Sequence, residues 1–186
     1  LKLDHDLEKN YISGLKSVVD SSIRKPVISF VGRSDAGKST IINAIIGMDK
    51  MPTAWTPTTS IVVYIKHISD RPDFIHDNVW VFRSHLRKDE MWDINRLYDE
   101  DYCKSWKLDQ GDVDILERLG VHQSDNSAGA GSAVVFLDSP FLQNCDIMDF
   151  PGYGTGNEKD DIVMKNSIND EILIYLSPQN GFLRIE

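Results

Sequence analysis

The fold is decided by residues 27–46, which read VISFVGRSDAGKSTIINAII. The first five residues are apolar apart from one serine, and this short run predicts a buried strand that stops at Gly32. Residues 39–46 have the apolar spacing of a helix, and Gly47 follows as a C-terminal stop. The stretch therefore predicts a strand, a glycine-containing loop and a helix in immediate succession.

The loop fits the pattern G-x-x-x-x-G-K-[ST] at every fixed position of residues 32–39. Its glycines let successive backbone N–H groups point at phosphate oxygens, and the helix that follows adds the positive end of its dipole. We predict that Lys38 reaches the β- and γ-phosphates and that the Ser39 hydroxyl ligates Mg²⁺. A chance glycine-rich turn is the alternative, which the strand–loop–helix context disfavours. The loop residues expected to bind the nucleotide are Gly32, Arg33, Ser34, Asp35, Ala36, Gly37, Lys38, Ser39 and Thr40.

A second motif, DIMDFPG, occupies residues 146–152, where an apolar run ends in an aspartate. In a nucleotide hydrolase of this kind, Asp149 would hold Mg²⁺ through a water and the Gly152 N–H could bond the γ-phosphate. An Asp-x-Pro-Gly turn is common loop chemistry by itself. Its place downstream of the phosphate loop, at the end of an expected strand, favours the functional interpretation.

A third motif, WTPTTS at residues 55–60, precedes an expected strand at residues 61–65. A threonine here could complete the Mg²⁺ coordination and fold the loop over the phosphate, so that the loop orders with the triphosphate. Thr58 and Thr59 are both candidates, and we favour Thr59; the alternative is a hydroxyl-rich turn that only starts a strand. The expected metal ligands are therefore Ser39, Thr59 and Asp149.

The remaining pattern alternates strands with helices. Further strands are expected at residues 133–137, 146–149 and 171–176, and helices at residues 1–22 and 161–169. This alternation predicts an α/β fold, a P-loop NTPase three-layer α/β/α sandwich with a mainly parallel sheet. The expected domain organisation is an N-terminal helix (1–24), a phosphate-loop part (25–68), an inserted subdomain (69–132) and a second catalytic part (133–186).

The inserted subdomain differs from the rest of the chain in charge and pattern. Between Asp70 and Asp125 the sequence has 14 acidic and 8 basic residues, and three of the four tryptophans lie in the insertion. We expect a strand at residues 79–82, helices at 89–104 and 112–119, and a flexible loop at 123–132. The tryptophans are expected to form a core rather than a wedge that inserts into a membrane.

Composition excludes several other classes of protein. With 186 residues, 41% hydrophobic and 26% charged, the chain has the balance of a globular domain. Two cysteines are too few for a disulfide framework, and the five histidines lack metal-ligand spacing. A net charge of −9 argues against nucleic acid as a partner, and no apolar run approaches the ~20 residues of a membrane span. We therefore expect a cytoplasmic protein.

Together the three motifs resemble the dynamin superfamily of large GTPases, bacterial dynamin-like proteins especially. The resemblance covers residues 22–68 and 133–182, and includes PTT at 57–59 and PFLQN at 140–144 ahead of DFPGY at 149–153. It implies hydrolysis of GTP to GDP with Mg²⁺, coupled to self-assembly or membrane remodelling. It further implies a homodimer formed through the nucleotide face and peripheral association with a membrane.

The resemblance also bears on catalysis. Ras-like GTPases place a water-orienting glutamine just after D-x-x-G, whereas this chain has Tyr153 there. Catalysis is therefore expected to come either from Lys38, Thr59 and a K⁺ or Na⁺ ion held by Asp35 with Ser34, or from a partner. A solvated loop residue is the alternative for Asp35, and an exposed loop arginine is the favoured interpretation of Arg33.

Guanine specificity rests on the resemblance alone. The base-recognition tetrapeptide Asn/Thr-Lys-x-Asp does not occur after Asp149. We therefore expect the domain to continue beyond Glu186, and we expect little or no turnover from residues 1–186 alone. Another P-loop regulatory GTPase, an ATPase and a slowly hydrolysing nucleotide-binding scaffold remain open as alternatives.

Overall fold

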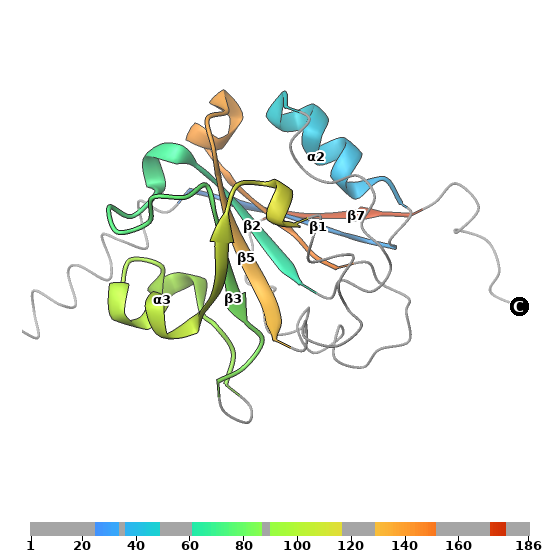
Figure 1. The fold of residues 1–186 in the computed structure, drawn as a ribbon. Coiled ribbons are helices and arrows are strands. Elements are labelled where there is room, and N and C mark those ends of the chain that lie inside the picture. Colours follow the sequence, from blue (N-terminus) through green and yellow to red (C-terminus); the bar gives the residue numbers. More distant parts are fainter. Residues whose placement is uncertain are drawn as a thin grey trace, which may run out of the picture.

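A computed structural model of the chain describes residues 25–33, 36–48, 61–86, 90–116, 129–151 and 172–177 (Figure 1). The helices expected at 1–22 and 161–169 lie outside these residues. Within the described ranges, a single sheet forms the centre of the molecule, with helices packed on both of its faces.

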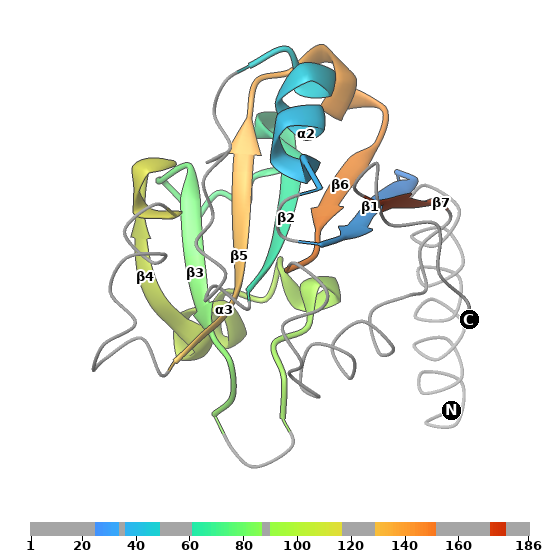
Figure 2. The same ribbon diagram turned by 90° about the vertical axis from the view of Figure 1, so that its right-hand side faces the viewer.

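The sheet has seven strands in the order β4-β3-β5-β2-β6-β1-β7, which Figure 2 shows from left to right. The strands are β1 (Val27–Gly32), β2 (Val62–His67), β3 (Val79–Arg83), β4 (Lys107–Gly111), β5 (Ala130–Leu137), β6 (Asp146–Asp149) and β7 (Ile172–Leu176). Strand β1 pairs in parallel with both β6 and β7, and β2 pairs in parallel with β5. The β2–β6, β3–β4 and β3–β5 pairs are antiparallel. The α/β fold is confirmed, with a parallel arrangement around β1 and a mixed one towards β4.

Two α-helices lie on opposite faces of this sheet (Figure 1). Helix α2 (Lys38–Ile46) buries Ile42 and Ile46 in the large cluster on one face. Helix α3 (Glu100–Trp106) buries Cys103 and Trp106 on the other. Three short 3₁₀ turns, η1 (Ile68–Asp70), η2 (Ile94–Arg96) and η3 (Pro140–Gln143), connect the elements. Helix, sheet and helix make the three layers that the sequence predicts.

The face that carries α3 has two buried clusters. The aromatic cluster contains Ile75, Trp80, Phe82, Trp92, Leu97, Cys103, Trp106, Val134 and Phe136. The loop-flanking cluster contains Val31, Val62, Met148 and Phe150. Tyr64 of β2 packs against both of them. The tryptophans in the described part of residues 69–132, hereafter the acidic segment, are thus core residues, as the sequence predicts.

One helix predicted in the acidic segment is wrong. The sequence predicts a helix over residues 89–104, but residues 90–93 are irregular and α3 starts only at Glu100. Two aspartates interrupt the helix, because the Asp93 carboxylate accepts from the Asn95 N–H and the Asp99 carboxylate accepts from the Tyr102 N–H. Such side-chain contacts favour a fresh start over continuation.

Other elements of this segment also differ from expectation. The expected strand at 79–82 is present as β3, and residues 114–116 of the helix expected at 112–119 are helical. Strand β4 has no counterpart in the prediction, and β5 begins at Ala130, inside the expected loop. Strands β3 and β4 extend the same sheet that carries the phosphate loop. The division of the chain into domains stays a prediction.

Candidate phosphate-binding site

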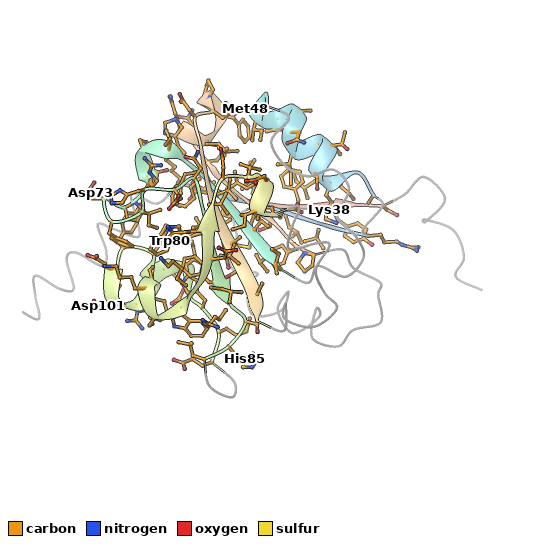
Figure 3. The ribbon with its side chains drawn as sticks, viewed as in Figure 1. Lys38, Met48, Asp73, Trp80, His85 and Asp101 are labelled. Carbon is orange, nitrogen blue, oxygen red and sulfur yellow. The ribbon has the colours of Figure 1, made fainter. Side chains whose placement is uncertain are left out.

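The loop between β1 and α2 is closed by its own lysine. The Lys38 ammonium donates to the carbonyl oxygens of Gly32 at 3.0 Å and Arg33 at 3.1 Å. The lysine is only 6% exposed, so its charge lies at the base of the loop rather than in bulk solvent. Figure 3 labels Lys38, the first residue of α2, away from Trp80 of the aromatic cluster. An ammonium held in this way is oriented before any anion binds.

Each glycine of the loop motif has its own structural reason. Gly37 is the N-cap of α2 with φ of +80°, a left-handed conformation that glycine adopts without penalty. Gly32 lies against β7, where an added Cβ would sit 2.3 Å from the Leu176 carbonyl oxygen. Gly37 therefore sets the turn into the helix, and Gly32 permits the close approach of two strands.

Helix α2 presents its first turn at the same end of the loop. Its N-cap glycine has no side chain that could accept from the first N–H groups, which leaves them suited to an anion. Ser39 is buried with 8% exposure, and its neighbour Thr40 is exposed. These two hydroxyl residues therefore differ in environment although they are adjacent.

The opposite end of α2 is fixed by a residue that the sequence analysis missed. The buried Ser139 hydroxyl donates to the Ile46 carbonyl at 2.7 Å, and it thereby satisfies a carbonyl of the last helical turn. Ser139 lies between β5 and η3, 93 positions from Ile46. The Ser-Pro pair at 139–140 indicates a turn, but no local pattern reveals a partner at that separation.

Strand β6 ends at Asp149, and because β6 is parallel to β1, this is the end of the sheet at which the phosphate loop begins. Asp149 is the register partner of Phe30 in β1 and of Val63 in β2. The residue is 5% exposed, and among the described residues its Oδ1 atom has no hydrogen-bond partner. Burial raises the pKa of this carboxyl to about 7, and the charge of Lys38 opposes the shift. A buried carboxylate oxygen that lacks a described hydrogen-bond partner is suited to receiving a cation.

The structure brings only part of the expected site into view. Gly32, Arg33, Ala36, Gly37, Lys38, Ser39, Thr40 and Asp149 are described, whereas Ser34, Asp35, Thr58, Thr59, Gly152 and Tyr153 lie outside the described residues. Arg33 is exposed. Because β2 runs antiparallel to β6 and starts opposite Asp149, the chain enters β2 at the edge that carries the phosphate loop.

Within the described ranges, no group of three or more His, Cys, Asp or Glu residues could hold a metal ion. None of the helices there is long and apolar enough to span a bilayer.

Comparisons with known proteins place this geometry in context. The model of a family described as the Dynamin family matches residues 28–183. Two similar solved structures concern an oligomerised bacterial dynamin pair in the long-range sensing and tethering of membranes, with identities of 18% and 19% and TM-scores of 0.48. Each match covers 88% of this chain and 22% of the other, so the chain spans about a fifth of their length. No curated protein sequence matches.

Proposed function

The chain belongs to the dynamin family, and on that premise we propose that it binds GTP with Mg²⁺ and hydrolyses it to GDP and phosphate. The observation that carries the proposal is the Lys38 ammonium, held by two loop carbonyls beside the first turn of α2. An oriented lysine and a helix N-terminus at one point favour a polyphosphate, whose charge they stabilise together. Lys38 would contact the β- and γ-phosphates, and the N–H groups of residues 32–40 would surround them.

Mg²⁺ fits the residues at this end of the sheet. The Asp149 carboxylate is buried with an oxygen that lacks a described partner, and a cation would favour its ionised form. The Ser39 hydroxyl would supply a second ligand, with Thr59 as the third and Gly152 on the γ-phosphate. When bound, the ion would neutralise charge that develops on the phosphates. Ser39, Lys38 and Asp149 would orient the triphosphate for attack by water.

Hydrolysis requires a group that compensates for charge in the transition state. Tyr153 stands where related GTPases have a water-orienting amide, so the residue there does not assist hydrolysis in the same way. We assign the compensation of charge in the transition state to K⁺ or Na⁺ bound by Asp35 and Ser34. Thr59, closing over the phosphates, would exclude bulk water. We further propose that the hydrolysis cycle is coupled to self-assembly through a homodimer at the nucleotide face. The cycle would also be coupled to remodelling of a membrane to which the protein binds peripherally.

Nucleotide competition tests the substrate. With Mg²⁺ present, unlabelled GTP should displace a fluorescent GTP analogue from residues 1–186 at concentrations at which ATP does not. Equal displacement by ATP would replace the GTPase proposal with an ATPase. Ser39→Ala should abolish the Mg²⁺ dependence of binding, whereas Thr40→Ala, a control that keeps the backbone N–H, should retain it.

Turnover tests the remaining steps. Phosphate release from a longer form of the protein should be faster in K⁺ or Na⁺ than in Li⁺, and equal rates would eliminate the monovalent ion. The rate should also rise with protein concentration or with added lipid vesicles. Tight binding with slow hydrolysis that neither of them changes would indicate a nucleotide-binding scaffold.

A further inference from the structure

Trp92 of the acidic segment contacts Tyr64 of β2, the strand that pairs with β6. Trp92 lies in the connection between β3 and η2, is 7% exposed, and stacks on Phe82 with ring centroids 4.0 Å apart at 11°. It also meets Tyr64 of β2 edge-on, with centroids 5.6 Å apart at 65°. Edge-to-face and stacked pairs at these distances stabilise packing beyond the area they bury. Trp92 is therefore fixed from two directions.

Tyr64 continues this contact towards the candidate site. It packs against the loop-flanking cluster and is the register partner of Met148 across the β2–β6 pair. Met148 and Phe150 stand immediately before and after Asp149, and Val31 of the same cluster precedes Gly32. The cluster therefore flanks both the start of the phosphate loop and the proposed Mg²⁺ ligand.

Helix α3 in turn holds the chain beside Trp92. The Asp93 N–H donates to the Tyr102 hydroxyl at 2.9 Å, and the Arg96 guanidinium lies 3.7 Å from the centroid of the same ring. The Tyr102 hydroxyl therefore holds the backbone next to Trp92. The packing is contiguous from Tyr102 through Trp92 and Tyr64 to the cluster that contains Met148 and Phe150, the chain neighbours of Asp149, which is the physical condition for coupling between two regions.

We propose that Trp92, acting through Tyr64, is a positioning residue for Asp149, so that the Trp92–Tyr64 contact and Mg²⁺-dependent nucleotide binding stabilise each other. The inference rests on the proposed function for its nucleotide. Coupling of this kind is reciprocal: the contact that fixes Trp92 against Tyr64 tightens Mg²⁺–GTP binding, and Mg²⁺–GTP stabilises that contact by the same factor.

The test compares two tryptophans of the same cluster. Trp92→Leu removes the ring contact with Tyr64, whereas Trp106→Leu is a matched control because Trp106 is 1% exposed and its ring contact is with Tyr102. Trp92→Leu should raise the Mg²⁺ concentration for half-maximal GTP-analogue binding about fivefold, and Trp106→Leu should leave it nearly unchanged. Trp92→Phe, which keeps a ring, should restore most of the wild-type value. Equal shifts in the two leucine variants, or none, would overturn the proposal.

A nucleotide-free measurement separates this inference from the proposed function. Without ligand, Trp92→Leu should increase amide hydrogen exchange at residues 147–150 relative to Trp106→Leu. If wild type shows no Mg²⁺-dependent GTP binding, the proposed function fails, and the exchange data alone decide whether Trp92 positions β6. Should Trp92→Leu not fold, Tyr64→Leu breaks the same contact from β2 and is read in the same way; unchanged exchange at 147–150 would refute the positioning role.

Discussion

The phosphate loop and the acidic segment of this molecule are built by different interactions over different sequence separations. Lys38 closes the loop through hydrogen bonds to carbonyls only five and six residues away. Trp92 in the acidic segment is held by Phe82 and by Tyr64, which is 28 positions away and belongs to another strand. The first region depends on local backbone geometry, and the second depends on the packing of rings between distant elements. A substitution in the loop should therefore act mainly on nucleotide binding. A substitution in the acidic segment should act mainly on global stability, and on binding only where the contact with Tyr64 is lost.

The largest expected change in the free energy of unfolding comes from a substitution in the acidic segment. Trp106 ends α3 and is 1% exposed, so Trp106→Ala should lower the free energy of unfolding by about 3–5 kcal/mol through lost burial and a cavity. Urea denaturation followed by circular dichroism measures this loss. Where the variant remains folded, its affinity for Mg²⁺–GTP should stay close to that of wild type. A loss below about 1 kcal/mol would contradict the assignment of this ring to the core.

Asp149 should make the phosphate-loop side sensitive to pH. Its pKa in the folded protein is raised to about 7 from an ordinary value of 3.8, so folding favours the protonated carboxyl. The stabilisation is complete below pH 4, falls as the pH rises towards 7, and is absent above it. Without metal or nucleotide, wild type should lose about 2–4 kcal/mol over this range relative to Asp149→Asn.

Equilibrium unfolding in EDTA at several pH values measures this difference. The slope with pH should be positive for the stability of Asp149→Asn minus that of wild type. Parallel pH profiles for the two proteins would show that the Asp149 carboxyl ionises as if it were solvated.

Substitution of Lys38 tests nucleotide binding by the phosphate loop. Lys38→Ala removes the positive charge that the loop carbonyls orient, so the affinity for Mg²⁺–GTP should fall about 100-fold. Isothermal titration calorimetry would measure the loss. Lys104→Ala on α3 is the control, because its ion pair with Glu100 is exposed and remote from the loop. Similar affinities for the two variants would remove Lys38 from the binding site.

The same contrast explains what the sequence could predict. The strand at 146–149 and the β1–loop–α2 unit follow from short apolar runs and from glycines placed at a turn and a close approach, all of which are local signals. Strand β4, read as KLDQG, lacks apolar alternation because it is an edge strand with polar side chains. Its pairing with β3 depends on tertiary context.

The start of β5 also could not be predicted from local sequence. Residues 123–132 have the composition of a flexible loop, yet Gly131 lies so close to β3 that a Cβ there would approach the Ser84 Cα to 2.4 Å. The glycine that indicates flexibility in the sequence is required in the structure by strand proximity. At the candidate site, two motifs predict roles for Lys38 and Asp149, but the burial that raises the Asp149 pKa comes from three strands that meet in space.

The smallest expected effect lies where the phosphate-loop helix meets a distant turn. Ser139→Ala leaves the Ile46 carbonyl at the end of α2 without its buried hydroxyl donor, and should lower the free energy of unfolding by about 1–2 kcal/mol. Ser105→Ala is a matched control, since its hydroxyl also donates at 2.7 Å to a carbonyl but is exposed, so water replaces it. Thermal or urea unfolding of both variants measures the difference. Equal losses would mean that burial of the α2 contact adds nothing, whereas a larger loss for Ser139→Ala would show that a long-range contact supports the most local motif of the chain.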